Sequence, residues 1–405
     1  MNKHECKTWA NTLIGLCAGA AVLSGCGGND TSVPAPVQRP VLATLDGKAP
    51  LVVAHRGASG ALPEQTVEAY AMAIAFGADA IEPDVVSTKD GVLIARHDPN
   101  LAYSTDVAQH PEFAARKKTM NVDGEVQEGW FASDFTLAEI KTLGGISTDA
   151  ERPQQFNGKY RIATIAEVID MVKKSGKQIA IYPETKNPTF HRQLGLPLED
   201  RLLTLLSAAG WSTKDAPVFV QSFEPGSLKI MRGKGSQLKM IQLIDADDVD
   251  LKTGALTYAP PYNRPFDWQL AGDTRLFSAM ATPAGLAEIK TYADGIGPWK
   301  RYIVSVKGTV GADGKIMDIN ADGKVNETDT ATIAPSSLIA DAHQAGLFVH
   351  AYTFRNEKRR LASDYKGDPK LEYKQFYELG IDGVFSDFAD TALAAKAEFL
   401  KDKGL

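Results

Sequence analysis

Residues 51–98 read LVVAHRGASGALPEQTVEAYAMAIAFGADAIEPDVVSTKDGVLIARHD, the pattern of a strand, a helix, a second strand and a hairpin. The apolar runs are LVVA, DAIEPDVV and VLIA, and the turn KDG separates the last two. The chemically active side chains of this stretch all lie beside the ends of those runs: His55, Arg56, Glu82, Asp84, His97 and Asp98. Two of the acids are two residues apart, so on a strand both point to the same face.

These residue types favour metal-assisted cleavage of a phosphate ester. Two carboxylates as close as Glu82 and Asp84 repel each other unless a cation lies between them, and hard divalent cations prefer oxygen ligands. Imidazole titrates near neutral pH, so His55 and His97 can serve as a general acid and a general base. Arg56 can bind a phosphoryl oxygen and offset the charge that develops during the reaction.

From Leu51 onward, apolar runs alternate with helical patterns in eight β-then-α units. The predicted strands are 51–54, 79–86, 178–183, 217–222, 239–244, 294–297, 347–353 and 382–386. The predicted helices lie near 64–76, 164–175, 198–209, 225–232, 283–293, 335–345, 370–379 and 389–402. Eight such units predict an α/β fold of the (β/α)₈ TIM-barrel type, whose chemistry lies at the carboxyl ends of the strands.

Two segments interrupt this alternation. Residues 98–163 are polar and loop-rich, and we interpret them as an insertion between the second strand unit and its helix. Residues 246–282 contain YAPPYNRPFDW and form a second excursion. Both should lie over the C-terminal mouth of the barrel, where long loops shape the site.

The quoted stretch resembles the glycerophosphodiester phosphodiesterase family. The matching elements are HRG, PEQT, the helix ending in GADAIEPDV, TKDG and HD, in the family's order and approximate spacing. The resemblance implies that Glu184, in the third-strand element KQIAIYPETK, completes a metal site with Glu82 and Asp84, and that Lys186 faces the phosphate. Gln65 of PEQT stands where the family usually has Asn, which puts any polar contact of that position in doubt.

The resemblance also implies the reaction, which is hydrolysis of a glycerophosphodiester to sn-glycerol 3-phosphate and an alcohol. The 2-hydroxyl of the glycerol would attack phosphorus to give a cyclic phosphate, which water then opens. Later elements, FVQSFE, YADGIGPWK, AYTFR and GVFSDF, look like strand ends of the exported branch of the family. They suggest four side chains that line the glycerol or leaving-group pocket, with packing at the barrel rim as the alternative: Gln221, Trp299, Tyr352 and Phe354.

The first residues have the pattern of a leader for export. Lys3 and Lys7 precede the apolar run LIGLCAGAAVL, and Leu23-Ser24-Gly25-Cys26 resembles a bacterial lipobox. We therefore expect a lipoprotein signal peptide at 1–25, acylation of Cys26, a flexible tether at 26–48 and the catalytic domain at 49–405. An ordinary secretory signal is the alternative. The expected location is the cell envelope, with a lipid anchor on the periplasmic face or in the outer membrane.

A second calcium motif lies at 318–329, DINADGKVNETD. It matches an EF-hand loop and is nearest to the loops of dockerin modules, with Gly323 at the sharp turn. The expected ligands are Asp318, Asn320, Asp322, Lys324 through its carbonyl, Asn326 and Asp329. Its role would be structural, and a solvated turn is the alternative.

Composition narrows the possible partners. The formal charge of the chain is −6, and it contains no basic run or basic-aromatic stripe, which argues against nucleic acid. We expect small glycerophosphodiesters as substrates and contact with a membrane only through the lipid anchor. The resemblance to the exported branch of the family, together with the expected envelope location, implies calcium as the catalytic ion, with magnesium possible. The oligomeric state stays open. Two rival functions are a phospholipase of the same barrel superfamily (D or phosphoinositide-specific type) and a non-catalytic envelope protein that binds phosphodiesters.

Overall fold

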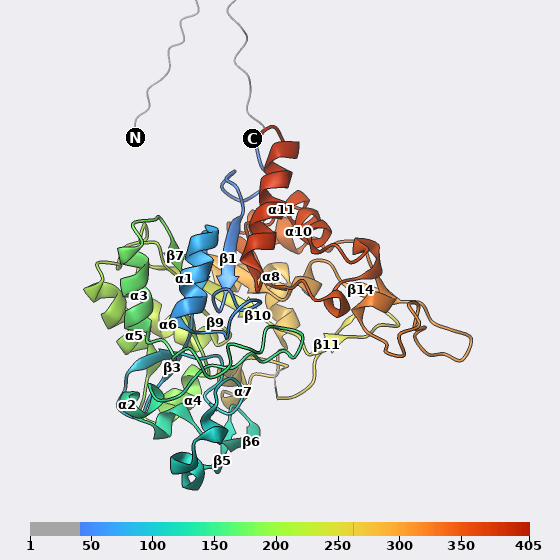
Figure 1. Ribbon diagram of the computed structural model, residues 1–405. Coiled ribbons are helices and arrows are strands. Elements are labelled where there is room, and N and C mark those ends of the chain that lie inside the picture. The colour runs from blue at the N-terminus through green and yellow to red at the C-terminus, as the bar shows by residue number, and fades with distance from the viewer. Residues whose placement is uncertain (1–40, 262) are drawn as a thin grey trace, which may run out of the picture. The chain divides into compact units, whose positions relative to one another are not determined.

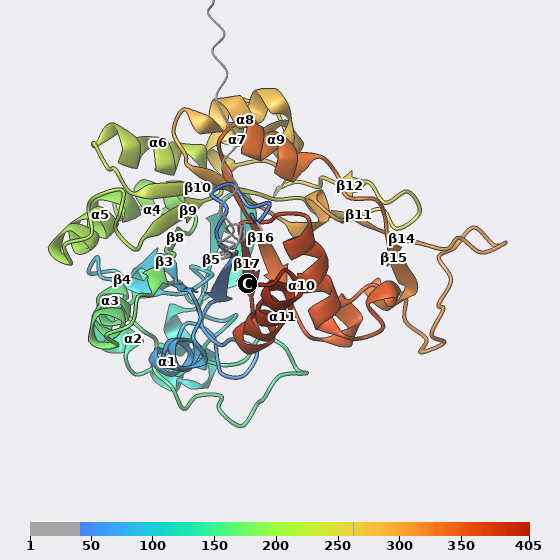
Figure 2. The ribbon, with the colours of Figure 1, turned by 90° about the horizontal axis from the view of Figure 1, so that it is seen from above.

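The structure is a computed structural model that describes residues 41–261 and 263–405. A ring of eight parallel strand units forms the centre of this described part (Figure 2). The units are β1 (Leu51–His55), β2 with β3 (Ala80–Glu82, Asp84–Ser87), β7 with β8 (Ala180–Ile181, Glu184–Thr185), β9 (Phe219–Ser222), β10 (Lys239–Ile244), β13 (Gly295–Pro298), β16 (Phe348–Phe354) and β17 (Gly383–Ser386). Because β17 pairs with β1, the ring closes, and the predicted barrel is confirmed.

Prolines divide the second and third strand units into two short pieces each. Pro83 and Pro183 have no backbone N–H, so each interrupts the regular hydrogen-bond ladder at one residue. The pairing resumes directly, because the Glu184 amide donates to the Pro83 carbonyl at 3.0 Å and the Gln221 amide to the Pro183 carbonyl at 3.0 Å. Each of these two strand units therefore keeps its pairing with the neighbouring strand across the break.

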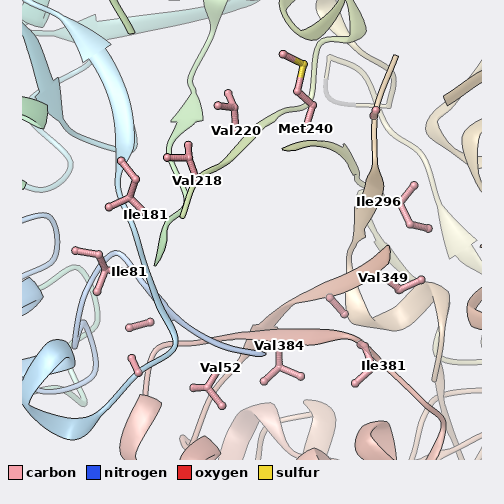
Figure 3. Packing of buried hydrophobic residues seen from close by; sticks show 14 of the residues in the cluster. Val52, Ile81, Ile181, Val218, Val220, Met240, Ile296, Val349, Ile381 and Val384 are labelled. Atoms are coloured by element: carbon pink, nitrogen blue, oxygen red, sulfur yellow. The ribbon is translucent and has the colours of Figure 1, made fainter. Parts of the chain in front are cut away.

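Helices follow the strands in the predicted order and cover the outside of the ring (Figure 2). They are α1 (Val67–Phe76), α3 (Ile165–Lys174), α5 (Leu198–Ala208), α6 (Pro225–Gly233), α8 (Pro283–Lys290), α9 (Leu338–Gln344), α10 (Pro369–Glu378) and α11 (Ala389–Asp402). Figure 3 shows apolar strand side chains such as Val52, Ile81 and Ile296 pointing away from the centre of the ring, toward these helices. Burial of this outer face stabilises the barrel, at about 25 cal/mol per Å² of apolar surface.

Local signals explain where the helices next to the site begin. Thr164 caps α3, and Glu167 returns a hydrogen bond to the Thr164 amide, a capping box that contributes about 1 kcal/mol. Thr66 caps α1 in the same way through the amide of Ala69. Helix α1 ends at Gly77, whose φ of 93° is accessible to glycine without steric cost.

The inside of the ring is packed with side chains toward the amino ends of the strands. Val53, Tyr182, Ile241 and Phe385 form a cluster there, and the Tyr182 hydroxyl lies 2.7 Å from Nδ1 of His350. This interior is filled with side chains, as in other small barrels. The open space therefore lies at the other end, above the carboxyl ends of the strands.

The 98–163 segment lies between the hairpin strand β4 (Leu93–Ala95) and α3, as predicted. It contains η1 (Val107–Gln109), η2 (Pro111–Arg116), β5 (Lys118–Val122), β6 (Glu125–Gly129), η3 (Ala132–Asp134) and α2 (Leu137–Ile140). It has its own apolar cluster, which includes Leu101, Phe113 and Phe135. The antiparallel hairpin β5–β6 is a feature that the loop interpretation missed.

The remaining elements belong to the segments that connect the strands and helices of the barrel. They are α4 (Pro188–Gln193), β11 (Asp248–Val249), β12 (Leu256–Thr257), α7 (Phe266–Leu270), η4 (Phe277–Ala281), η5 (Lys300–Tyr302), β14 (Val306–Gly308), η6 (Glu327–Asp329), β15 (Thr330–Thr332), η7 (Lys358–Arg360) and η8 (Ser363–Tyr365). The segment between β14 and β15 projects away from the ring in both views (Figures 1 and 2). Within the described residues, no helix combines the length and apolar character needed to span a bilayer.

Candidate active site

Strand register brings the three predicted acidic ligands together. In the parallel ladders His55 pairs with Glu82, Asp84 with Glu184, and Glu184 with Gln221. Adjacent strands are about 5 Å apart, so these side chains converge from neighbouring positions of the ring. Ligand atoms of Glu82, Asp84 and Glu184 all lie within 4.8 Å of one another, and all three residues are buried.

This concentration of buried negative charge changes the titration of the three acids. Burial raises the pKa of Glu82 well above its ordinary value, and the neighbouring carboxylates Asp84 and Glu184 add to the effect. Burial also raises the pKa of Glu184 to about 8, with Lys186 opposing the shift. For Asp84 burial is outweighed by His97 and the nearby cationic groups, which lower its pKa.

The donor set fits a hard divalent cation. Oδ1 of Asp84 is buried and has no hydrogen-bond partner, and Oε1 of the neighbouring Gln221 is likewise unpartnered. Nε2 of Gln221 donates to Oε1 of Glu82 at 3.1 Å, which orients that carboxylate. The three candidate ligands are all carboxylates, and oxygen ligands suit Ca²⁺ or Mg²⁺ better than a softer metal. The buried triad could therefore hold a metal ion.

Arg56 follows the first strand and lies against the same carboxylates. Its amide donates to Oε2 of Glu82 at 2.8 Å, and its Nε is 3.4 Å from Oδ2 of Asp84. Its Nη1 pairs with Glu64 at 3.1 Å. Burial by itself would lower the pKa of Arg56, but these carboxylates raise it, so the guanidinium stays charged. Its φ of 58° is uncommon outside glycine and is typical of functional sites.

Gln65, where the family usually has Asn, makes a direct contact with the triad. Its Nε2 donates to Oδ2 of Asp84 at 2.5 Å, and the Tyr70 hydroxyl donates to its Oε1. The longer amide side chain therefore reaches a triad carboxylate and holds it in place. A polar contact is present at this position in spite of the substitution.

His55 forms a buried pair with a residue that the sequence did not single out. Its Nδ1 lies 2.5 Å from Oδ1 of Asp387, which directly follows the last strand, β17. Burial lowers the pKa of His55, and Arg56 lowers it further, so the ring is neutral at pH 7. Despite its burial, Asp387 beside Arg355 and His55 has a pKa well below its usual range. An ionised carboxylate only accepts, so Nδ1 carries the proton and Nε2 is free to accept one.

Two arginines hold Asp387 in turn. Arg355 donates to its Oδ2 at 2.9 Å, and Arg152 donates to the same oxygen at 2.5 Å. Arg152 belongs to the 98–163 insertion and also binds Glu357 at 2.8 Å. The insertion therefore contributes to the support of His55.

Replacing Asp387 tests this positioning role. Asp387→Asn should lower kcat by on the order of 10²-fold or more, because the amide can donate to Nδ1 and favour the wrong tautomer. Asp387 raises the pKa of His55, so its loss lowers that pKa, and the acidic limb of the kcat/KM profile should move to lower pH. Asp390→Asn, an exposed acid three residues further on, is the control. An acidic limb that stays in place would contradict the assignment.

His97 lies near the triad, shortly after the hairpin strand β4. Its Nε2 is 3.1 Å from Nζ of Lys186, and its Nδ1 is 3.1 Å from Oδ2 of Asp98. Lys186 is 2.8 Å from Oε1 of Glu184 and keeps a raised pKa, since Glu184 and Asp84 outweigh the effect of burial. His97 and Lys186 therefore lie close enough to the triad to act on the charge of Asp84, as His55 also does.

One cavity of about 470 Å³ lies at the C-terminal mouth, and the groups that line it are His55, Arg56, Glu82, His97, Asp98, Glu184 and Lys186. Asp84 and Asp387 are not part of its lining. Among the residues proposed for the pocket, Gln221 and Tyr352 line it. Trp299 and Phe354 do not. Trp299 packs beside Val249 and Leu361, and Phe354 faces outward onto Tyr373 and Phe376 of α10. The expectation that these two side chains line the pocket is corrected, because each lies on the outer side of its strand end.

The calcium-like loop is separate from this cavity. The Asp318 carboxylate accepts hydrogen bonds from the amides of Asp322 and Gly323, and Asp329 accepts from those of Ile319 and Asn326. Among the described residues, the Glu82–Asp84–Glu184 triad is the one group of three acids, cysteines or histidines that gathers closely enough for a metal. The predicted loop ligands Asn320 and Lys324 lie in this same exposed turn. Cys26, the proposed acylation site, lies outside the described residues.

A (β/α)₈ barrel with buried acids, two imidazoles and cationic side chains at its mouth has the composition of a phosphoric ester hydrolase. Comparison with known proteins agrees. The glycerophosphoryl diester phosphodiesterase family model matches residues 55–391. A glycerophosphodiester phosphodiesterase of Arabidopsis thaliana is 36% identical over 370 residues, with 88% of each chain covered. One from Haemophilus influenzae is 31% identical over 418 residues, with 98% of each chain covered. The chain belongs to this family and is an enzyme, a phosphoric diester hydrolase.

Solved structures agree on the fold. A phosphodiesterase of Oleispira antarctica, determined in complex with its product sn-glycerol-3-phosphate, superposes with a TM-score of 0.53 at 18% identity and covers 87% of this chain. The match covers 98% of the Oleispira antarctica chain. A glycerophosphodiester phosphodiesterase of Agrobacterium tumefaciens has a TM-score of 0.50 at 16% identity, with 85% and 99% covered.

Proposed function

We propose that the enzyme hydrolyses water-soluble glycerophosphodiesters to sn-glycerol 3-phosphate and an alcohol, with a divalent cation and a pair of histidines. The observation that carries this proposal is the single cavity in which the buried triad is flanked by His55 and His97. Family membership and the glycerophosphodiesterase relatives support the substrate class.

Glu82, Asp84 and Glu184 would hold the cation, and calcium is favoured over magnesium because the proposed envelope location supplies it. A cation bound there polarises a phosphoryl oxygen and offsets the negative charge that develops on it. Arg56 and Lys186 lie on the edge of the triad and bind the remaining phosphoryl oxygens. Both keep their positive charge in spite of burial.

His55 is the general base in this proposal. Its neutral ring and its Asp387-bound Nδ1 leave Nε2 to take the proton from the glycerol 2-hydroxyl. The 2-oxygen then bonds to phosphorus as the bond from phosphorus to the alcohol oxygen breaks. In its doubly protonated form His97, paired with Asp98 through Nδ1, gives its Nε2 proton to that departing oxygen.

The second step reverses these roles. The cyclic phosphate opens when water adds to phosphorus: one histidine takes a proton from the water, and the other returns a proton to the 2-oxygen. Both histidines return to their starting protonation states, and sn-glycerol 3-phosphate is released. Intramolecular attack is favoured because the nucleophile is already held near phosphorus.

Turnover on a defined panel tests this function. The metal-loaded enzyme should release sn-glycerol 3-phosphate from glycerophosphocholine and glycerophosphoglycerol, lose activity with a chelator and regain it with calcium or magnesium. A phosphocholine diester of 1,3-propanediol, which lacks the 2-hydroxyl, should be inert if the cyclic step operates. Activity on phosphatidylcholine alone would favour the phospholipase and overturn the substrate class.

We also propose that the enzyme is a lipoprotein of the cell envelope and that residues 318–329 bind a second, structural calcium ion. The support for both is the sequence: the lipobox before Cys26 and the EF-hand spacing of the loop. Mass spectrometry of the mature N-terminus in membrane fractions tests the first, and a calcium stoichiometry of two per chain tests the second.

A further inference from the structure

Two excursions from the barrel lie at the end toward which β1 points, where β5, β6 and α7 are labelled in Figure 1. One is the tip of the β5–β6 hairpin, and the other comprises Pro261 and residues 263–277. A methyl group added to Gly124 at the hairpin tip would lie 3.4 Å from Cβ of Pro261. Both excursions line the cavity that contains the triad, so together they form its outer wall.

This outer wall contains acceptors that have no partner. Asp123 lies at the turn of the hairpin, where side chains are usually exposed, yet only 8% of its surface is accessible. Its Oδ2 accepts from Nδ2 of Asn187 at 2.6 Å, and its Oδ1 has no partner. Gln127, also 8% exposed, has an unpartnered Oε1. Two buried acceptor atoms in the wall therefore lack a donor.

The wall is rich in acidic groups. Glu224 is buried beside Asp123, and its carboxylate accepts hydrogen bonds from Thr189. Asp267 adds a third acid near both. Burial and the Asp123 charge together raise the pKa of Glu224 to about 8, and burial raises that of Asp123 to about 6. A cation placed among these groups would relieve their repulsion.

The neighbouring basic side chains divide their charge among several partners. Nη2 of Arg192 is 3.6 Å from Glu224, and Arg192 also pairs with Glu199. Lys186 pairs with Glu184, and Nη1 of Arg264 donates to the carbonyl of Asp273 at 3.0 Å. Aromatic rings complete the wall on its apolar side: Phe223, Phe266 and Phe277. Acids combined with aromatic faces are the surroundings that alkylammonium groups prefer.

The wall is directly connected to the phosphate-binding side of the cavity. Asn187, which holds Asp123, follows Lys186 in the chain, and Lys186 contacts Glu184 of the triad. A phosphodiester bound at the triad can therefore extend one of its two ester groups along this short path toward Asp123.

We infer that the β5–β6 hairpin, together with Pro261 and residues 263–277, forms a subsite for a positively charged alcohol, and that Asp123 makes the enzyme prefer glycerophosphodiesters of cationic alcohols. This inference rests on the proposed function and adds the class of leaving group to it. Glycerol hydroxyls could donate to the unpartnered acceptors, but glycerol lacks the positive charge that the acids of the wall favour. The ammonium of ethanolamine supplies both the charge and N–H donors, whereas the trimethylammonium of choline has no N–H and would be held by its charge and the aromatic faces. Choline and ethanolamine esters are the corresponding substrates.

Asp123→Asn tests the subsite with little risk to the fold, because Asn-Gly is as suitable as Asp-Gly for a two-residue hairpin turn. The metal-loaded enzyme is assayed on glycerophosphocholine and on the uncharged glycerophosphoglycerol. We expect the ratio of the two kcat/KM values to fall about tenfold, mainly through KM for the choline ester. The inhibition constant of choline chloride should rise by a similar factor. Glu224→Gln should lower the same ratio.

Glu128→Gln is the matched control, because it removes a carboxylate from the same hairpin at an exposed position paired with Lys117. It should leave the ratio at its wild-type value. Parallel loss on both substrates in Asp123→Asn would assign the wall to the shared glycerol half and overturn the inference, as would an unchanged ratio. Absence of wild-type turnover on either substrate would instead refute the proposed function itself.

Discussion

Glu184→Gln is expected to lower kcat/KM for glycerophosphocholine by on the order of 10³-fold and to abolish tight binding of one divalent cation. The amide keeps the shape of the side chain but removes one of three charges that converge within 4.8 Å. Calorimetric titration with calcium and with magnesium measures the binding, and product release measures turnover. Glu288→Gln on α8, remote from the cavity, controls for the substitution.

The same variant should be more stable than the wild type when metal is removed. Burial raises the pKa of Glu184 to about 8 in the folded protein, above its value in the unfolded chain. The wild type therefore loses stability relative to the variant as pH rises from about 4.5 to 8, because the unfolded chain ionises first. With a chelator present, the advantage of Glu184→Gln in melting temperature should be larger at pH 8 than at pH 5. A smaller advantage at pH 8 would contradict the account of the triad.

The two histidines should differ in their response to the leaving group. His55→Ala and His97→Ala should each lower kcat for glycerophosphocholine by 10²–10⁴-fold while the fold is retained, the usual contribution of a general acid or base. A p-nitrophenyl ester of glycerol phosphate releases a stable anion that needs no proton. On that ester His97→Ala should recover most of the wild-type rate, whereas His55→Ala should stay impaired.

Circular dichroism and melting curves of both variants provide the fold control. Recovery of His55→Ala in place of His97→Ala would exchange the two roles. Wild-type rates on glycerophosphocholine in either variant would remove that histidine from the mechanism.

The sequence predicted the barrel well because apolar runs and helix signals agreed along the chain. The strand 239–244 and the helix 389–402 were predicted with the bounds that the structure has. The proline positions limited accuracy elsewhere: 79–86 and 178–183 were predicted as single strands, whereas Pro83 and Pro183 divide them. The prolines themselves are visible in the sequence. That hydrogen bonds from the neighbouring strand resume directly after each proline depends on the closed ring and cannot be seen in a local pattern.

The site was predicted in part, and the omissions have physical reasons. Glu82, Asp84 and Glu184 could be foreseen because equivalent ends of parallel strands meet at one edge. Asp387 could not be paired with His55 from local pattern, because their contact exists only when the last strand closes against the first. The residue does follow the strand GVFS directly, and that position was the available signal.

The hairpin that forms the cavity wall did leave a signal that was missed. Lys118–Val122 and Glu125–Gly129 flank Asp123-Gly124, a dipeptide that favours tight hairpin turns. The many polar residues of this segment led to a loop interpretation. Trp299 and Phe354 failed for another reason, since the direction of a side chain at a strand end depends on local backbone geometry that composition does not reveal.

The contact of Arg152 with Asp387 makes catalysis depend on a segment outside the barrel. The three acids of the triad all belong to strands of the ring, whereas the orientation of His55 also depends on the insertion. Under the proposed mechanism, metal affinity and turnover are therefore separable properties of this enzyme.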